Sequence, residues 1–236
     1  MLKDYIEKRK STRKYDMNPL DEDTLKEIRQ FASSMRPLVE GIQIDYRFAS
    51  AGEVKNILPI KAPHYIIISS DPEDLYLPNV GFLFQQMDLF LSSKGLGSCW
   101  LGLAKPSKNV HTEKEFVIIL AFGRALGSPY RDMSDFRRKS LSEICDTSDE
   151  RLECARLAPS ASNSQPWYFI TDQDTFHVYR VETGTLRSMI YKRMNQIDIG
   201  IALAHLYLSY PKFSYTFQTD PKHIKGYEYM GTVSLI

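Results

Sequence analysis

The chain has 236 residues, of which 43% are hydrophobic and 25% are charged. These proportions are those of an ordinary globular protein, which argues against disorder, collagen and coiled coil. Thirty lysines and arginines oppose 29 aspartates and glutamates, so the chain lacks the basic excess that is typical of nucleic-acid-binding proteins.

The first part of the chain predicts an alternation of helices and strands. A short helix is expected at 2–9, and a second helix at 25–31 presents one apolar face. Residues 80–91 are apolar on nearly every side, which predicts a helix buried between other layers. The expected strands are at 42–48, 65–68 and 116–122.

The rest of the chain repeats this pattern. The letters RKS at 9–11 recur at 138–140, and NVGF at 79–82 is echoed by DIGI at 198–201 in a second apolar stretch. A further helix is expected at 152–158, and further strands at 168–171 and 229–235.

Repetition of a whole pattern bears on the architecture more than any single element does. The sequence therefore predicts two related α+β repeats, at 1–130 and 131–236, packed as one globular unit in the manner of a C2 dimer. The alternative is that two helices resemble one another only because both are buried.

The cysteines and histidines do not predict a metal site or a disulfide framework. Cys99, Cys145 and Cys154 are too few for either, and the five histidines are scattered. The N-terminal segment lacks the apolar core of a signal peptide, and no apolar run reaches the ~18 residues of a membrane-spanning helix. We expect a cytoplasmic protein with no membrane partner.

Two basic segments are suited to holding a phosphate. RKSTR at 9–13 places two guanidiniums and two hydroxyls within five residues, and both groups donate hydrogen bonds to phosphate oxygens. A solvated basic face at a helix end would have the same composition. RRK at 137–139 is a second basic cluster, which either closes on the same phosphate or belongs to a surface linker.

Two further segments are suited to a flat heterocycle. APSASNSQPW at 158–167 predicts a rigid loop rich in donors and acceptors, although an ordinary connector would also look like this. GLGSCWLG at 95–102 contains glycines that permit close approach of the backbone to a ligand. It lacks the dinucleotide-binding fingerprint, and a helix cap followed by a turn is the alternative. Cys99 lies in this segment without an identified histidine partner, so we expect a buried small residue.

Together these segments resemble the FMN-dependent nitroreductase family. The matches are RKSTR at 9–13, KGLGSCWLG at 94–102, FRRKSLSEI at 136–144 and APSASNSQPW at 158–167. The chain is similar to the single-chain, two-repeat branch of that family. The resemblance implies a nitroreductase-like α+β sandwich, with a mostly antiparallel sheet flanked by helices and an internal duplication forming a pseudo-dimer.

The order of the motifs departs from the family. There the serine-rich loop precedes the glycine segment, whereas here it follows. Duplication explains the difference if the first repeat keeps the phosphate clamp and the glycine segment and the second repeat keeps the loop. The early slot, FASSMRP at 31–37, has no asparagine and no PW pair. We therefore expect the second site to be degenerate and one FMN to bind per chain.

The resemblance also assigns roles to individual residues around FMN. The phosphate would be held by Arg9, Ser11 and Arg13, with Arg137 and Arg138 assisting. The edge of the flavin that carries N5 would lie near Leu96 and Gly97. The ring would be lined by Pro159, Ser160, Ala161 and Asn163.

The implied activity is that of an NAD(P)H oxidoreductase. NAD(P)H would deliver hydride to flavin N5, and a nitroaromatic, quinone or similar small acceptor would then accept it. No side chain is expected to act as a catalytic residue, and the acceptor pocket is expected from 58–61 and 184–195. The protein would be a monomeric pseudo-dimer or a weak homodimer. The alternatives are a non-catalytic flavin-binding protein, such as a sensor or carrier, and another flavin reaction on the same scaffold.

Overall fold

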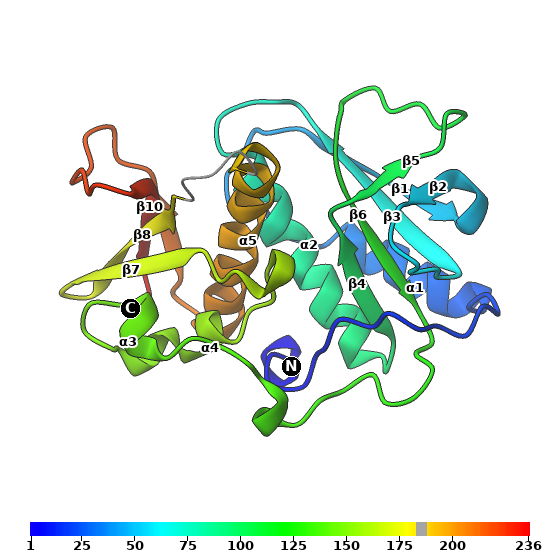
Figure 1. Cartoon of the computed structure of the whole chain (residues 1–236), viewed down its shortest axis with the longest axis horizontal. Coiled ribbons are helices and arrows are strands. Elements are labelled where there is room, and N and C mark those ends of the chain that lie inside the picture. The colour runs from blue at the N-terminus through cyan, green and yellow to red at the C-terminus, as the bar shows by residue number, and fades with distance from the viewer. Residues whose placement is uncertain (183–187) are drawn as a thin grey trace. The chain divides into compact units, whose positions relative to one another are not determined.

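The computed structural model describes residues 1–182 and 188–236 of the chain, which fall into two compact units. The first unit consists of 1–76 and 86–133, and the second consists of 77–85 and 134–236. Helix α2, Tyr76–Ser93, is therefore divided between them (Figure 1). The repeats predicted at 1–130 and 131–236 stay a prediction, because the second unit also includes 77–85 from the first predicted repeat.

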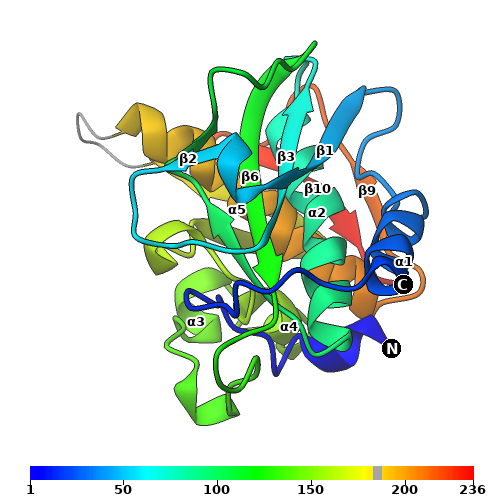
Figure 2. The same cartoon turned by 90° about the vertical axis from the view of Figure 1, so that its right-hand side faces the viewer.

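The first unit contains a four-stranded antiparallel sheet in the order β1-β3-β6-β4. Figure 2 shows β6 beside β3, and β3 beside β1. The four strands are β1 (Ile44–Ser50), β3 (His64–Ser70), β4 (Gly97–Leu101) and β6 (Glu115–Gly123). The other elements are the helix α1 (Glu22–Ala32), the paired strands β2 (Val54–Asn56) and β5 (Ala104–Pro106), and single 3-10 turns at Leu2–Tyr5 and Ala51–Glu53.

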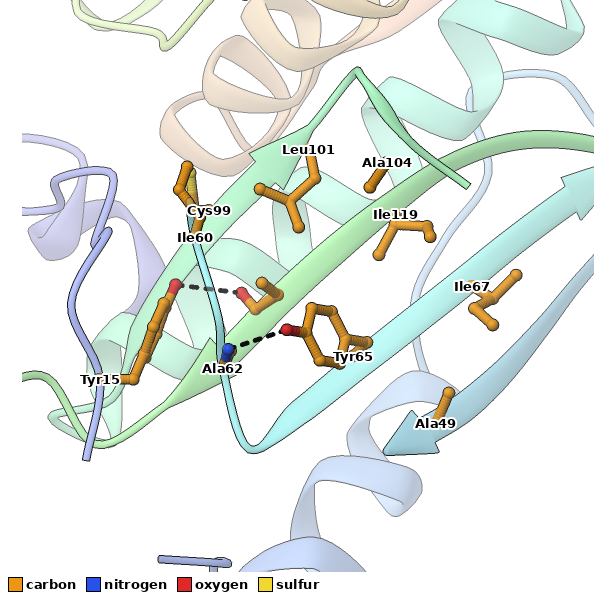
Figure 3. Packing of buried hydrophobic residues seen from close by; sticks show 11 residues of the cluster. Tyr15, Ala49, Ile60, Ala62, Tyr65, Ile67, Cys99, Leu101, Ala104 and Ile119 are labelled. Carbon is orange, nitrogen blue, oxygen red and sulfur yellow. Dashed lines mark hydrogen bonds between the residues drawn. The ribbon is translucent and has the colours of Figure 1, made fainter. Parts of the chain in front are cut away.

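Strand β3 is buried on both faces, which is why its sequence contains a continuous apolar run. Ile66, Ile67 and Ile68 on neighbouring positions are each at most 1% exposed, as in strands buried on both sides. On one face Ile67 and Ile119 pack with Tyr15, which comes from the N-terminal segment (Figure 3). The Tyr15 hydroxyl lies 3.5 Å from the Ala121 carbonyl oxygen and donates to it.

The second unit contains its own four-stranded antiparallel sheet, in the order β7-β8-β10-β9. The strands are β7 (Trp167–Asp172), β8 (Thr175–Val181), β9 (Ser214–Thr216) and β10 (Tyr227–Ser234). The helices are α3 (Leu141–Ile144), α4 (Glu153–Arg156) and α5 (Ser188–Ser209), with 3-10 turns at Met133–Asp135, Glu150–Leu152 and Ala161–Asn163.

The two sheets have the same topology. In each, two neighbouring antiparallel strands are followed by a long helix and then by two more strands, and the last strand inserts between the second and the third. The first sheet does this with β1, β3, α2, β4 and β6, and the second with β7, β8, α5, β9 and β10. This identity is what a duplication of the α+β pattern would produce.

The echoed NVGF and DIGI segments meet where α5 crosses the first half of α2. A Cβ atom on Gly200 would lie 1.8 Å from the backbone oxygen of Pro78, and one on Gly81 would lie 2.0 Å from that of Ile197. Such contacts are closer than any side chain tolerates, so only glycine allows the two backbones to approach this closely. The burial expected for both apolar helices is confirmed, with Phe82 and Leu203 at most 1% exposed.

Candidate functional site

The predicted cofactor residues fall into two groups, one in each unit. The first unit holds Arg9, Ser11, Arg13, Leu96 and Gly97. The second unit holds Arg137, Arg138, Pro159, Ser160, Ala161 and Asn163. The structure brings residues together within each group, and a single site shared by both groups stays a prediction.

In the first unit the RKSTR segment lies directly against the glycine segment. Ser11 forms a parallel bridge with Ser98, and the Thr12 amide donates to the Ser98 carbonyl oxygen at 2.8 Å. A Cβ atom on Gly97 would lie 2.3 Å from Oγ1 of Thr12. The side chain of Thr12 thus leaves no room for a larger residue at position 97, whether or not a ligand also approaches the backbone there.

Arg9 is held by a buried carboxylate that the sequence analysis did not identify. The side chain of Arg9 is 1% exposed, and its Nε lies 2.9 Å from Oδ2 of Asp88, which is fully buried on α2. Ser98 donates its hydroxyl to the other oxygen of Asp88, and Nη2 of Arg9 donates to Oγ of Ser11 at 3.3 Å. The available signal was that Asp88 is the single charged residue of the apolar stretch 80–91.

Three buried polar atoms of this group make no hydrogen bond within the described residues: Nε and Nη1 of Arg9 and Oγ1 of Thr12. Nε lies 2.9 Å from the Asp88 carboxylate in an ion pair, so Nη1 is the nitrogen of Arg9 left without an acceptor. A buried donor without an acceptor is costly, and a phosphate oxygen is an acceptor suited to a guanidinium. Ser11 is half-buried and Arg13 is exposed on the same segment. The residues present therefore fit a phosphate group.

In the second unit the other basic segment is bound to the serine-rich loop. Nη1 of Arg138 donates to Oδ1 of Asn163 at 2.6 Å, and Nδ2 of Asn163 donates to the Arg137 carbonyl oxygen at 2.8 Å. Nη2 of Arg138 also donates to the Leu157 carbonyl oxygen at 3.3 Å. The basic segment at 137–139 and the serine-rich loop thus form one connected cluster.

The serine-rich loop is held in an unusual conformation by its own side chains. Ser162, Asn163 and Gln165 have φ angles of 52°, 57° and 47°, a left-handed region that few residues other than glycine and asparagine adopt readily. Oγ of Ser160 accepts from the Gln165 amide at 2.9 Å. Nε2 of Gln165 donates to the Asn163 carbonyl oxygen at 3.1 Å, so the side chains of Ser160 and Gln165 shape the loop itself.

A second buried carboxylate, Asp198 on α5, supports this loop. Both of its oxygens lie 3.1 Å from the Ala161 nitrogen, which donates to them. Burial raises the pKa of Asp198 well above its usual range, and the hydrogen bond from Ala161 opposes the shift. In the sequence Asp198 stands out only as the first residue of the repeated DIGI segment, and its role depends on a tertiary contact that the sequence does not reveal.

The remaining expectations concern the thiol, metals and the acceptor pocket. Cys99 is buried and burial raises the pKa of its thiol, as expected for a packing residue. Among the described residues, no cluster of side chains could hold a metal ion, and no helix has the length and apolarity needed to cross a bilayer. Of the expected pocket segments, 58–61 is described, whereas 184–187 lies outside the described residues.

A cavity of about 300 Å³ in the second unit contains none of the predicted FMN residues, although Lys192 on its wall belongs to the segment 184–195 expected for the acceptor pocket. Its walls include Tyr179, Lys192, Tyr227 and Tyr229. The predicted FMN residues therefore rest on the hydrogen-bond networks described above, and not on this cavity.

Comparison with known proteins identifies a family and a fold. The family model described as "Putative TM nitroreductase" matches residues 1–210. A crystal structure of a "putative nitroreductase" from Thermotoga maritima superposes with a TM-score of 0.69 at 18% identity, covering 99% of this chain and 93% of that one. These findings confirm the predicted nitroreductase-like α+β fold.

Two shorter structures match part of the chain. A nitroreductase family protein from Clostridium difficile 630 has a TM-score of 0.47 at 19% identity, covering 61% of this chain and 95% of that one. An FMN-dependent nitroreductase from Clostridium difficile R20291 has a TM-score of 0.44 at 18% identity, covering 56% and 93%. No curated protein matches the chain.

Proposed function

Because this chain belongs to the family described as "Putative TM nitroreductase", we propose that it binds one FMN and acts as an NAD(P)H oxidoreductase. When bound, FMN would supply the hydride-accepting and hydride-donating centre. The observation that carries the proposal is the RKSTR segment, where a buried guanidinium nitrogen of Arg9 has no acceptor among the described residues. The acceptor would be a nitroaromatic, a quinone or a similar small molecule.

The phosphate end of the site would be built by the first unit. Ser11 and the exposed Arg13 present a hydroxyl and a guanidinium from one extended segment, and Arg9 contributes its Nη1. A phosphate monoester carries about −1.5 to −2 charges at neutral pH. Charge-assisted bonds from guanidinium groups are among the strongest polar contacts in proteins.

The ring end would be built by the serine-rich loop of the second unit. Ser160 and Asp198 accept hydrogen bonds from backbone amides of the loop, and the Asn163 side chain anchors the loop to the Arg137 carbonyl oxygen. A preorganised loop loses little conformational entropy when a flat ring packs against it. Pro159, Ser160, Ala161 and Asn163 would line the flavin from this side.

An asymmetry between the units supports one FMN per chain. Matching Gly81 of α2 with Gly200 of α5 aligns Asp88 with Tyr207, which packs against Phe82 and Phe213 instead of holding an arginine. Arg138, which corresponds to Arg9 in the repeat, is bonded to Asn163. The second repeat therefore lacks a carboxylate in the position from which Asp88 holds Arg9.

The test is flavin binding by the purified protein. We expect a yellow protein with one FMN per chain, bleached by NADH or NADPH under anaerobic conditions. Arg13→Ala should weaken FMN binding at least about tenfold, or ~1.4 kcal/mol. Lys14→Ala is the matched control, because Lys14 is the exposed next residue and a cation outside the proposed clamp.

The outcomes separate the alternatives. A protein that does not take up FMN would refute the proposal. A flavoprotein that neither coenzyme reduces would instead favour the non-catalytic flavin-binding function. An unchanged affinity in Arg13→Ala would remove Arg13 from the phosphate site.

A further inference from the structure

We propose that Asp88 is a positioning residue for the phosphate end of the site, acting through Arg9. The inference rests on the proposed function, since it concerns how the chain holds FMN. It starts from the burial of the pair: the side chains of Arg9 and Asp88 are 1% and 0% exposed. Each charge would be expensive to bury without the other.

The contacts around Asp88 fix it from two directions. Its Oδ2 lies 2.9 Å from Nε of Arg9, and its Oδ1 accepts from the hydroxyl of Ser98. Ser98 is also the residue that pairs with the RKSTR segment, through Ser11 and the Thr12 amide. One carboxylate thus ties together α2, the glycine segment and the basic segment.

Because the guanidinium is planar, these contacts also determine the orientation of its third nitrogen, Nη1. Nε of Arg9 is held by Asp88, and Nη2 is held by Oγ of Ser11 at 3.3 Å. Because the five N–H groups of arginine lie in one rigid plane, fixing these two nitrogens also fixes where Nη1 points. Nη1 is the nitrogen that has no acceptor among the described residues.

Charge and geometry make opposite predictions for the variant Asp88→Asn. The substitution removes a negative charge next to the proposed phosphate, so electrostatic attraction alone would tighten FMN binding. If Asp88 acts by orienting Arg9, the same substitution weakens binding, because asparagine has no charge and a single acceptor oxygen in place of the two that hold Arg9 and Ser98. The sign of the change therefore distinguishes a positioning residue from a mere neighbouring charge.

The experiment measures the dissociation constants of FMN and riboflavin for the wild-type protein and for Asp88→Asn by flavin fluorescence. Riboflavin lacks the phosphate, so it reports the ring end alone. We expect at least about tenfold weaker FMN binding with unchanged riboflavin binding. The effect should disappear in an Arg9→Ala background, as a double-mutant cycle requires for a residue that acts through Arg9.

Three results would overturn the inference. These are FMN binding that is unchanged or tighter in Asp88→Asn, equal losses for FMN and riboflavin, and a full Asp88→Asn effect in the absence of Arg9. If Asp88→Asn does not fold, Ser98→Ala replaces it, with a selective loss of FMN affinity expected and an equal loss of both ligands refuting. A wild-type protein that binds riboflavin and FMN equally also refutes the positioning role, whereas one that binds neither refutes the proposed function itself.

Discussion

Substitution of Gly200 by alanine tests the close crossing of α2 and α5. The new Cβ atom would lie 1.8 Å from the Pro78 oxygen and 2.7 Å from the Phe82 nitrogen, both of which are backbone atoms. Ordinary contact begins near 3.4 Å, so the helices would have to separate by about 1.6 Å (3.4 − 1.8). A backbone atom cannot rotate away as a side chain can, so we expect a loss of stability at the high end of the range for overpacked cores.

The expected magnitude is the difference between two opposing effects. Overpacking a core typically costs ~1–3 kcal/mol, and we expect about 3 kcal/mol for so short a contact. Alanine within a helix gains ~1 kcal/mol over glycine. The net loss is therefore about 2 kcal/mol, which for a chain of this size lowers the melting temperature by roughly 4–8 °C.

The assay is urea and thermal denaturation of the flavin-free protein, followed by circular dichroism. Gly81→Ala should behave in the same way, because its Cβ would lie 2.0 Å from the Ile197 oxygen. Gly52→Ala is the control, since no heavy atom lies within 4 Å of the added Cβ. A Gly200→Ala protein as stable as the wild type would refute the account of the crossing.

Three further predictions follow from burial and from the asymmetry of the repeats. The folded-state pKa of Asp198 is raised, so wild-type stability should fall as pH rises from the ordinary carboxyl pKa through the raised one. Asp198→Asn should flatten that slope in urea titrations at several pH values, and an unaltered slope would exclude Asp198 as its source. Ile119→Ala should cost ~2–5 kcal/mol, because Ile119 is fully buried, and a loss below this range in urea denaturation would count against the packing shown in Figure 3. Titration with FMN should saturate at one flavin per chain, and two equivalents would contradict the degeneracy of the second repeat.

Continuous burial made much of the fold predictable. The apolar run around Ile67 lies in β3, and the stretch 80–91 forms most of α2. Both were predictable because a segment that is buried on all sides has an almost unbroken run of apolar residues. The expected helix at 2–9 was wrong beyond its first turn. Arg9 forms an isolated bridge with Tyr130 and its side chain pairs with Asp88, so tertiary contacts override local helix propensity there.

Short elements and long-range contacts were less predictable. The expected helix at 152–158 is a 3-10 turn followed by the single-turn helix α4, Glu153–Arg156, and β8 and β9 were not predicted. The site motifs were found because they lie within short segments. The pairing of Ser11 with Ser98, and the roles of Asp88 and Asp198, depend on residues far apart in sequence, and no local pattern encodes such pairings.

The division of α2 between the units determines where this polypeptide can be cut. A fragment ending at residue 133 would carry 77–85, including Val80, Phe82 and Phe84, without the remainder of the second unit. These side chains are at most 1% exposed in the intact chain, so such a fragment would expose apolar side chains to solvent and be prone to aggregate. A fragment beginning at 134 would lack the helical turns against which Gly200 packs. Splitting the protein for engineering would therefore require supplying this helix to both pieces.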